Sequence, residues 1–467
     1  MAKKNNGKDF IIFILLIALF SSILFFLLGN WNQFIAGIIF ITSILAFLFF
    51  WRFRVGIVAI GLTLLILTGT IDIETSLKFM NFDIIIFLIG MMVLVAMLRD
   101  VGFFSWIGIR LNKFAKFNAK NLFVIILLLS AVMAALVGEV ISILFISTLI
   151  ISICDQYKVN PVKYVISAVF ATNIGSSWTV LGNPIGIIIA MRAGLTFEDF
   201  IRWAFPVGLA SLLILVLLML LILRNDIKTF QQNINKKIKS ENSKSVDEII
   251  ETVDKTIDKK ALKIGVTIFF SIIFLISIHA RIEALLNLEK NTFLIIAPIA
   301  GAGVAMVWRR EKAQKYVERV DWWNLVFFIF LFSIAGCISY VGLSDRMAIS
   351  IANYSKSLPL MVILISLISA FASSVIDNVV LVTSFIPIIS SLASSGINVF
   401  PLWWALLFGG CYGGNITQIG STANIVALGV LEKRKHYYIK PKEWIPVGLV
   451  AGIIPAIIGL IFLLVQI

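Results

Sequence analysis

The hydrophobic positions of the chain fall into long runs separated by short polar gaps. Two regions, 162–190 and 401–431, are apolar at both ends but contain glycine-rich polar loops, so we expect each to cross a membrane once as a broken helix. Nine other runs are long enough to cross a hydrocarbon core of about 30 Å as plain helices; they lie near 10–29, 34–51, 55–70, 82–98, 199–223, 263–280, 291–307, 322–339 and 443–466. The pattern predicts an all-α polytopic membrane protein with about eleven transmembrane helices.

Two further apolar stretches are of double length and have a polar pair at their centres. The pair is Gly138-Glu139 in residues 121–153 and Asp377-Asn378 in residues 359–395. We expect each stretch to form a re-entrant hairpin that returns to the side of the membrane from which it started.

Composition and charge exclude most soluble classes. Residues are 60% hydrophobic and only 14% charged, and mean hydropathy is +1.03, whereas soluble domains carry about 25% charged residues. The net charge of +14 would suggest nucleic acid in a soluble chain, but here the basic residues occupy the gaps between spans, so we expect a lipid bilayer and no nucleic acid as partner. All but seven of the 39 Lys and Arg residues lie on one side of the predicted topology; the seven are Lys78, Arg192, Arg202, Arg281, Lys290, Arg346 and Lys356. The positive-inside rule then predicts a multi-pass protein of the cytoplasmic membrane with its N-terminus in the cytoplasm and its C-terminus outside.

The two halves of the chain repeat each other. At a constant offset, residues of the same kind return: Glu139 aligns with Asp377, Gly175 with Gly413, Thr179 with Thr417 and Gly182 with Gly420. The charge count makes span 82–98 run inward and its partner 322–339 run outward, so the repeats are inverted, as in secondary transporters. We therefore expect an extra N-terminal span in residues 1–30, a first repeat in 31–223, a cytoplasmic linker in 224–262 and a second, inverted repeat in 263–467.

Two segments have the spacing of amphipathic helices. In the linker, apolar residues recur at helical spacing from Val246 to Ile257, and Phe103–Phe117 sets apolar positions against Arg110, Lys113 and Lys116. We expect a short cytoplasmic helix in the first and a helix lying in the membrane interface in the second.

The two broken helices are the densest in groups that could bind an ion. Irregular backbone survives at membrane depth only where it lines a cavity or finds partners, and unwound carbonyl groups together with hydroxyl and amide side chains suit Na⁺. The alternative is that small polar residues only allow close helix packing. The candidate binding residues of the loops are Asn173, Gly175, Ser176, Ser177, Thr179, Asn183, Asn415, Thr417, Ser421, Thr422 and Asn424.

Glu139 and Asp377 are the two carboxylates that this topology places deep in the membrane, and Asn378 follows the second. A charge at that depth costs at least about 2.5–3.5 kcal/mol, so such a residue normally faces a cavity and has a function. Both are candidates to exchange H⁺ for Na⁺; the alternative is a carboxyl group that stays protonated for hydrogen bonding or reaches out to water. With no Lys or Arg beside them, an anionic substrate would need cations bound with it.

The motifs resemble those of the ion transporter superfamily, specifically the branch of arsenite permeases and NhaD-type sodium–proton antiporters, with citrate-transporter-like carriers as wider relatives. The motifs are NFDIIIFLIGMMVLVAMLRDVGFF from Asn81, ATNIGSSWTVLGNPIGII from Ala171, SAFASSVIDNVVLVTSFIPII from Ser369 and GGNITQIGSTANIVA from Gly413. The resemblance implies two inverted repeats, each with a re-entrant hairpin, a homodimer, and a transport domain that moves against a scaffold.

Two departures from the family pattern bear on the site. The first hairpin has Gly138-Glu139-Val140 where Asp-Asn-Val is usual, so family spacing puts Gly138 at the aspartate position while the internal repeat pairs Glu139 with Asp377. The first loop has Asn183 and Gly186 where Asp and Asn are usual. The substrate is therefore not carried over from the resemblance.

These features favour a secondary active transporter that moves a small inorganic ion or small organic anion, coupled to H⁺ or Na⁺, over an enzyme. A Na⁺/H⁺ antiporter and an arsenite efflux permease are the alternatives, and a membrane-embedded aspartyl-type hydrolase or a passive channel is more remote. No cofactor is expected beyond the coupling ion, with Na⁺ at the same loops. The sequence has no G-x-x-x-x-G-K-[ST] motif, so use of ATP would require a separate energising subunit.

Overall fold

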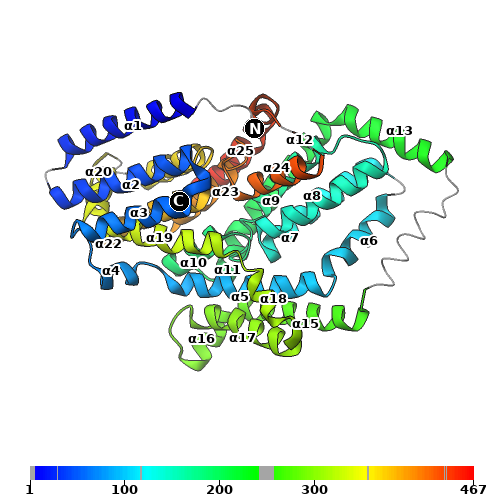
Figure 1. The fold of residues 1–467 in the computed structure, drawn as a ribbon, viewed down its shortest axis with the longest axis horizontal. Helices are drawn as coiled ribbons and strands as arrows, with labels where there is room; N and C mark the ends of the chain where they lie inside the picture. The colour runs from blue at the N-terminus through cyan, green and yellow to red at the C-terminus, as the bar shows by residue number, and fades with distance from the viewer. Residues whose placement is uncertain are drawn as a thin grey trace. The chain divides into compact units, whose positions relative to one another are not determined.

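The protein is described from a computed structural model that covers residues 6–28, 30–115, 118–240, 257–354, 357–435, 437 and 439–467. Throughout these residues it consists of helices, turns and loops, without a strand (Figure 1). The predicted all-α class is therefore confirmed. The helix expected at residues 246–257 lies almost wholly outside the described part of the chain.

Many of the helices have the length and composition of membrane spans. Within the described residues, seven pass this test: Ile73–Asp100, Ala119–Val137, Glu139–Gln156, Phe197–Ile222, Lys259–Ser277, Trp322–Tyr340 and Pro441–Val465. An eighth is the pair Thr292–Trp308 and Arg310–Glu318, bent by 106°. Shorter apolar helices occupy the other predicted runs, among them Phe10–Phe26, Trp31–Ala46 and Arg54–Leu67. The chain is thus a polytopic membrane protein, while the count of eleven crossings stays a prediction.

The described chain forms two compact units, and each takes segments from both sequence repeats. Unit 1 comprises residues 1–85, 321–362 and 379–403, and unit 2 comprises residues 86–320, 363–378 and 404–467. Four helices run from one unit into the other: α5 (Phe82–Asp100), α21 (Leu358–Ser373), α22 (Asn378–Ser394) and α23 (Phe400–Gly413). The spatial units therefore differ from the repeat boundaries read along the chain.

Unit 1 is built around the packing of α3 and α19 (Figure 1). Arg54 at the start of α3 donates to Asn324 Oδ1 on α19 over 2.6 Å, and Ser333 Oγ on α19 donates to Ser76 O over 2.9 Å. The helices that lie wholly in this unit are α1 (Asn6–Leu27), α2 (Trp31–Phe49), η1 (Trp51–Phe53), α3 (Arg54–Leu67), α4 (Ile73–Lys78), α19 (Trp322–Tyr340) and α20 (Leu343–Tyr354).

Unit 2 contains three helices, α7, α8 and α9, that pack against one another side by side (Figure 1). The helices that lie wholly in this unit are α6 (Phe103–Ala115), α7 (Ala119–Val137), α8 (Glu139–Gln156), α9 (Val162–Gly175), α10 (Pro184–Ala193), α11 (Phe197–Asp199), η2 (Phe200–Ala204), α12 (Phe205–Ile222), α13 (Arg224–Ser240), α15 (Lys259–Ser277), α16 (His279–Leu286), α17 (Thr292–Trp308), η3 (Arg310–Lys312), α18 (Ala313–Glu318), α24 (Thr422–Lys435) and α25 (Pro441–Val465). The predicted interface segment is thus helical in α6.

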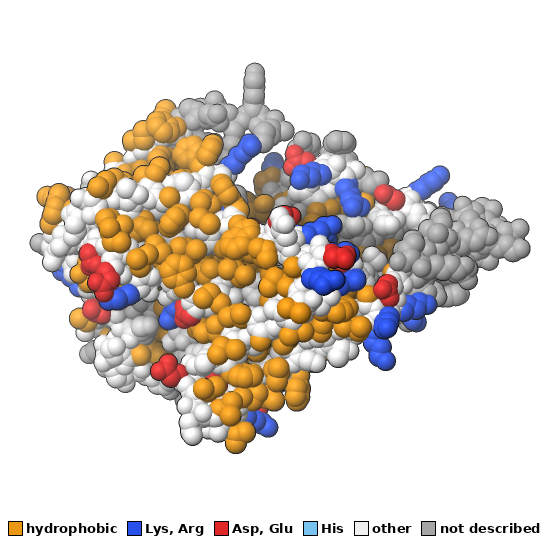
Figure 2. Space-filling view, turned by 60° about the horizontal axis from the view of Figure 1, so that its bottom comes forward, with side chains coloured by type: hydrophobic (Ala, Val, Ile, Leu, Met, Phe, Trp, Pro, Cys, Tyr) orange, Lys and Arg blue, Asp and Glu red, His pale blue; other side chains and the backbone are white. Residues whose placement is uncertain are grey.

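The surface of the described residues is rich in apolar side chains. Figure 2 shows one face on which hydrophobic side chains cover broad areas, while Lys and Arg gather in separate groups. Large hydrophobic residues are strongly exposed on several helices, such as Leu67, Leu221 and Val307. Soluble proteins rarely expose contiguous apolar areas of this kind, so this surface suits contact with lipid.

The first hairpin breaks at the predicted position. Gly138 alone separates α7 from α8, with φ of +90°, and Ser142 Oγ on α8 donates to Ser130 O on α7 over 3.1 Å. The two limbs therefore fold back on each other. Each limb is also long enough to cross the membrane by itself, but either arrangement returns the chain to the side from which it started.

We expect Gly138→Ala to destabilise the protein by about 1–2 kcal/mol, because a side chain disfavours the left-handed half of φ space. The measurement is the unfolding midpoint of the detergent-solubilised protein, which should fall. Gly429→Ala in α24 is the matched control, since a methyl group there meets no atom within 4 Å. Equal midpoints for Gly138→Ala and the native protein would contradict the assignment of the hairpin tip.

Candidate ion- and substrate-binding site

Unit 2 contains the whole first broken helix and all of the second except the first residues of α23. In the first repeat, α9 ends at Gly175 and α10 begins at Pro184; in the second, α23 ends at Gly413 and α24 begins at Thr422. We call residues 176–183 the first loop and residues 414–421 the second loop. The Asn183 side chain caps α10 by accepting from Gly186 N over 2.8 Å, and Pro184 occupies the first position of that helix, where its missing N–H costs nothing.

The two loops have the same internal hydrogen-bond pattern. Thr179 Oγ1 donates to Ala135 O at the end of α7, and Thr417 Oγ1 donates to Ser374 O, just after α21. In each loop the threonine hydroxyl also accepts from the backbone N–H two residues later, over 3.2 Å in the first loop and 3.3 Å in the second. Each loop is therefore fastened to its own hairpin by one threonine.

Glycine allows each broken helix to approach its hairpin closely. A Cβ atom at Gly175 would lie 2.3 Å from the backbone of Ala131 on α7, and one at Gly413 would lie 2.2 Å from Ala370 O on α21. The paired glycines of the sequence repeat thus serve the same close contact in each half.

Asn173, in the last turn of α9, joins the first broken helix to the second. Its amide nitrogen donates to Asn415 Oδ1 over 2.8 Å and to Asn424 Oδ1 over 2.9 Å, and its amide oxygen accepts from Ser421 Oγ over 3.0 Å. All four side chains are buried. The two broken helices, far apart along the chain, meet at this residue.

Two of the contacts between the broken helices are reciprocal. Asn183 Nδ2 donates to Cys411 Sγ over 3.1 Å, while Ser421, which aligns with Asn183 in the repeat, donates to Asn173, which aligns with Cys411, over 3.0 Å. Exchanged contacts of this kind arise when two equivalent segments are related by a twofold axis. They are what an inverted repeat produces where its halves meet.

Both predicted carboxylates lie where the two broken helices meet, a place that we call the crossing. Glu139 is the first residue of α8, 2% exposed, and its N–H donates to Gly182 O in the first loop over 2.9 Å. The side chains of Ser176 and Asn378 lie beside its carboxyl group, and Asp377 belongs to the same electrostatic neighbourhood. Glu139, and not Gly138, therefore provides a buried carboxyl group at this position.

Asp377 is 4% exposed and is held by the residue that follows the second loop. Its Oδ2 accepts from Thr422 Oγ1 over 2.8 Å, at the start of α24. The N-terminus of a helix favours an anionic group, which helps to hold this carboxylate in its place.

The crossing is rich in oxygen atoms and poor in basic groups. Glu139 Oε2 and Asn378 Oδ1 are buried and have no hydrogen-bond partner among the residues that the structure describes. In the same part of the chain no lysine or arginine is buried, and no group of three or more His, Cys, Asp and Glu side chains is placed to hold a metal ion. Free carboxylate and amide oxygen atoms are ligands suited to a hard cation such as Na⁺.

Several candidate residues have most of their polar atoms occupied by structural contacts. Asn424 donates to Gly414 O and Thr417 O, both over 2.7 Å, and Asn415 donates to Ala451 O on α25 over 3.0 Å. These side chains hold the shape of the second loop. Glu139, Asp377 and Asn378 are the residues whose position best fits contact with an ion.

Three residues at the crossing were outside the predicted set. Cys411 Sγ accepts from Asn183, Tyr412 OH lies 3.1 Å from Ser177 Oγ, and Trp444 Nε1 donates to Asn415 O over 2.9 Å. Cys411 and Tyr412 belong to an apolar helix, so only their place immediately before the second loop distinguished them.

The chain is similar to membrane transporters over most of its length. It is 28% identical over 358 residues to an uncharacterized transporter of Mycobacterium tuberculosis, covering 76% of this chain and 79% of the relative. It is 27% identical over 354 residues to a 46 kDa membrane protein of Mycobacterium leprae, covering 75% and 78%, and 24% identical over 463 residues to the P protein of Homo sapiens, covering 83% of this chain and 54% of that protein. Among solved structures it is similar to the YdaH transporter of Alcanivorax borkumensis, with a TM-score of 0.49, 16% identity, and coverage of 82% and 84%.

One family model assigns the chain to a particular family of transporters. The model described as citrate transporter matches residues 38–409, which is most of the chain and includes both hairpins and the whole first loop. The sequence motifs indicated the ion transporter superfamily and included citrate-transporter-like carriers as wider relatives. The family model that matches is the one for those carriers. The chain is therefore a transporter that belongs to the citrate transporter family of the ion transporter superfamily.

Proposed function

We propose that this transporter is a secondary active carrier that moves a small carboxylate-bearing anion across the membrane together with H⁺ or Na⁺. The family description, citrate transporter, supplies the substrate class. The observation that carries the coupling is the burial of Glu139 and Asp377 at the meeting of the two loops, with no buried lysine or arginine among the described residues.

The charge of the site explains why transport would be coupled. A multiply charged anion is repelled by two carboxylates in a medium of low dielectric constant, where opposite or like charges interact far more strongly than in water. Protonation of the carboxyl groups, or binding of Na⁺ between them, removes this repulsion. The anion then binds well only to the cation-loaded site, and a difference in affinity of this kind is what couples two ligands.

The same residues support the alternative of Na⁺/H⁺ antiport. A carboxylate pair that binds either a proton or Na⁺ exchanges one for the other without any anion. Arsenite efflux has less support from the site, because Cys411 is the one cysteine among its residues and its sulfur atom already accepts from Asn183.

The test is a flux screen with the native protein in liposomes under imposed pH or Na⁺ gradients. Citrate, dicarboxylates, sulfate, arsenite and Na⁺ without an added anion are offered in turn, and protein-free liposomes are the control. We expect carboxylate uptake that rises with one of the two gradients and stops when an ionophore collapses it. Proton movement driven by Na⁺ alone, with no carboxylate uptake, would replace the proposal with antiport. Carboxylate uptake indifferent to both gradients would refute coupling.

A further inference from the structure

A cavity of unit 2 lies away from the crossing, between α6 and the start of α15. Its volume is about 350 Å³, within the range of small-molecule sites. Three cationic side chains line it, Arg110 from α6 and Lys259 and Lys263 from α15, and no acidic residue is among its lining residues in the described chain. The Arg110 guanidinium lies 5.4 Å from the centre of the Trp106 ring. This cluster of like charges has no role in the proposed transport.

The remaining walls of the cavity are apolar. Phe103 and Trp106 line it from α6; on α15, Leu262 lies between the two lysines and Val266 lies beyond them. On α15, Lys259, Lys263 and Val266 recur at helical spacing and so share one face. The α15 side of the cavity is therefore basic at Lys259 and Lys263, with apolar Leu262 between them and apolar Val266 further into the helix.

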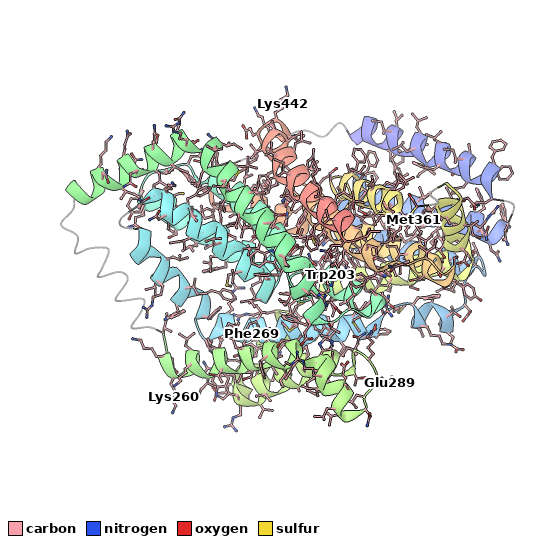
Figure 3. The ribbon with its side chains drawn as sticks, turned by 180° about the vertical axis from the view of Figure 1, so that it is seen from behind. Trp203, Lys260, Phe269, Glu289, Met361 and Lys442 are labelled. Atoms are coloured by element: carbon pink, nitrogen blue, oxygen red, sulfur yellow. The ribbon has the colours of Figure 1, made fainter. Side chains whose placement is uncertain are left out.

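The position of α15 places the basic end at a membrane surface. Figure 3 shows Lys260 at the start of α15 and Glu289 at the far end of the segment formed by α15 and α16, with Phe269 between them. Helix α15 has the length and composition of a membrane span, and the positive-inside rule assigns its lysine-rich start to the cytoplasmic side. That surface of a bacterial or eukaryotic membrane carries anionic lipids.

We propose that this cavity binds the phosphate-bearing headgroup of an anionic phospholipid. The three cations hold the headgroup phosphate, Arg110 is oriented by stacking on Trp106, and the first carbons of an acyl chain pack on Phe103, Leu262 and Val266. A free phosphate ion would use the cations but not the apolar wall. The combination of both on one continuous surface favours a lipid.

The test uses the purified full-length protein in detergent, with bound phospholipid counted by native mass spectrometry. Phosphatidylglycerol is compared with phosphatidylcholine, with glycerol phosphate and with inorganic phosphate. We expect phosphatidylglycerol to bind about 10-fold or more tightly than any of the other three, and its binding to weaken at high salt. If glycerol phosphate or inorganic phosphate binds as tightly, or if phosphatidylcholine does, the lipid proposal is wrong.

Paired variants locate the binding. Arg110→Gln with Lys263→Gln should weaken phosphatidylglycerol binding about 10-fold or more. Lys260→Gln with Lys120→Gln removes the same charge from exposed lysines that do not line the cavity, and should leave binding unchanged. Equal weakening by both pairs would show that general surface charge is responsible and would overturn the site.

A measurement on the native protein avoids dependence on how the variants fold. A photoactivatable phosphatidylglycerol should label peptides from residues 103–110 and 259–266, and unlabelled phosphatidylglycerol should compete. Labelling confined to other helices would overturn the proposal.

Discussion

Asp377→Asn is expected to lower gradient-driven uptake by on the order of 100-fold. This factor lies in the upper part of the range by which one ligand usually changes the affinity for another. Asparagine has nearly the shape of aspartate and can still accept the hydrogen bond from Thr422 Oγ1, which spans 2.8 Å in the native protein. It cannot bind a proton or supply negative charge to Na⁺. The loss should therefore be one of transport and not of folding.

The measurement is uptake into liposomes of the substrate that the flux screen identifies, with protein content and elution profile matched to the native protein. Glu74→Gln is the control, because Glu74 is an exposed carboxylate on α4 whose ion pair with Lys78 lies at the surface. It should transport as the native protein does. Native coupling in Asp377→Asn would remove this carboxyl group from the mechanism.

Asn173→Leu is expected to lower the stability of unit 2 by about 3 kcal/mol or more and to abolish transport. Leucine fills a similar volume but makes none of the three hydrogen bonds of Asn173. Asn415 Oδ1, Asn424 Oδ1 and Ser421 Oγ then lose a partner in a buried place, and each buried polar group left without a partner costs about 1–3 kcal/mol.

The unfolding midpoint in detergent and the uptake rate should fall together in this variant. Asn225→Leu, at an exposed position on α13, controls for the exchange of an amide for an apolar side chain and should change neither. Unaltered stability in Asn173→Leu would mean that the loops are held by other contacts.

The positions of the loops were predictable because their residues are chemically unusual for a membrane span. Gly175, Gly182 and Pro184 interrupt an apolar run, and the same interruption returns in the second half. The geometry agrees with this prediction down to the two threonines that fasten the loops, Thr179 and Thr417. Their role in binding an ion remains to be tested by the measurements above.

The choice between Gly138 and Glu139 was not predictable, because spacing alone supported both. The structure separates them by backbone conformation: Gly138 has a φ of +90°, while Glu139 begins a helix and its carboxyl side chain is buried. A dihedral angle of this kind depends on how two limbs pack, which a one-dimensional pattern does not contain.

The sequence also did not show which polar side chains hold the loops in shape and which have polar atoms free to bind an ion. Asn415 and Asn424 have side chains that could bind an ion, yet their amide nitrogens donate hydrogen bonds to the backbone oxygens of Ala451, Gly414 and Thr417. Which amide is free depends on how the loop folds around Asn424 and on packing against a separate helix, as with Ala451 on α25. For the same reason Tyr412, within an apolar helix, gave no signal of its contact with Ser177.

The whole account requires the two broken helices to meet, and a disulfide between the first loop and α23, the helix just before the second loop, tests this most directly. Asn183→Cys is placed opposite native Cys411, because Asn183 Nδ2 lies 3.1 Å from Cys411 Sγ in the native protein. Cys154→Ala and Cys337→Ala remove the other thiols. A protease site is inserted in the linker after Ser240. After mild oxidation and cleavage, the account predicts that the two halves migrate as one species until a reductant is added. Thr229→Cys on α13 in place of Asn183→Cys should give separate halves. Separate halves in the Asn183→Cys protein as well would contradict the meeting of the two broken helices.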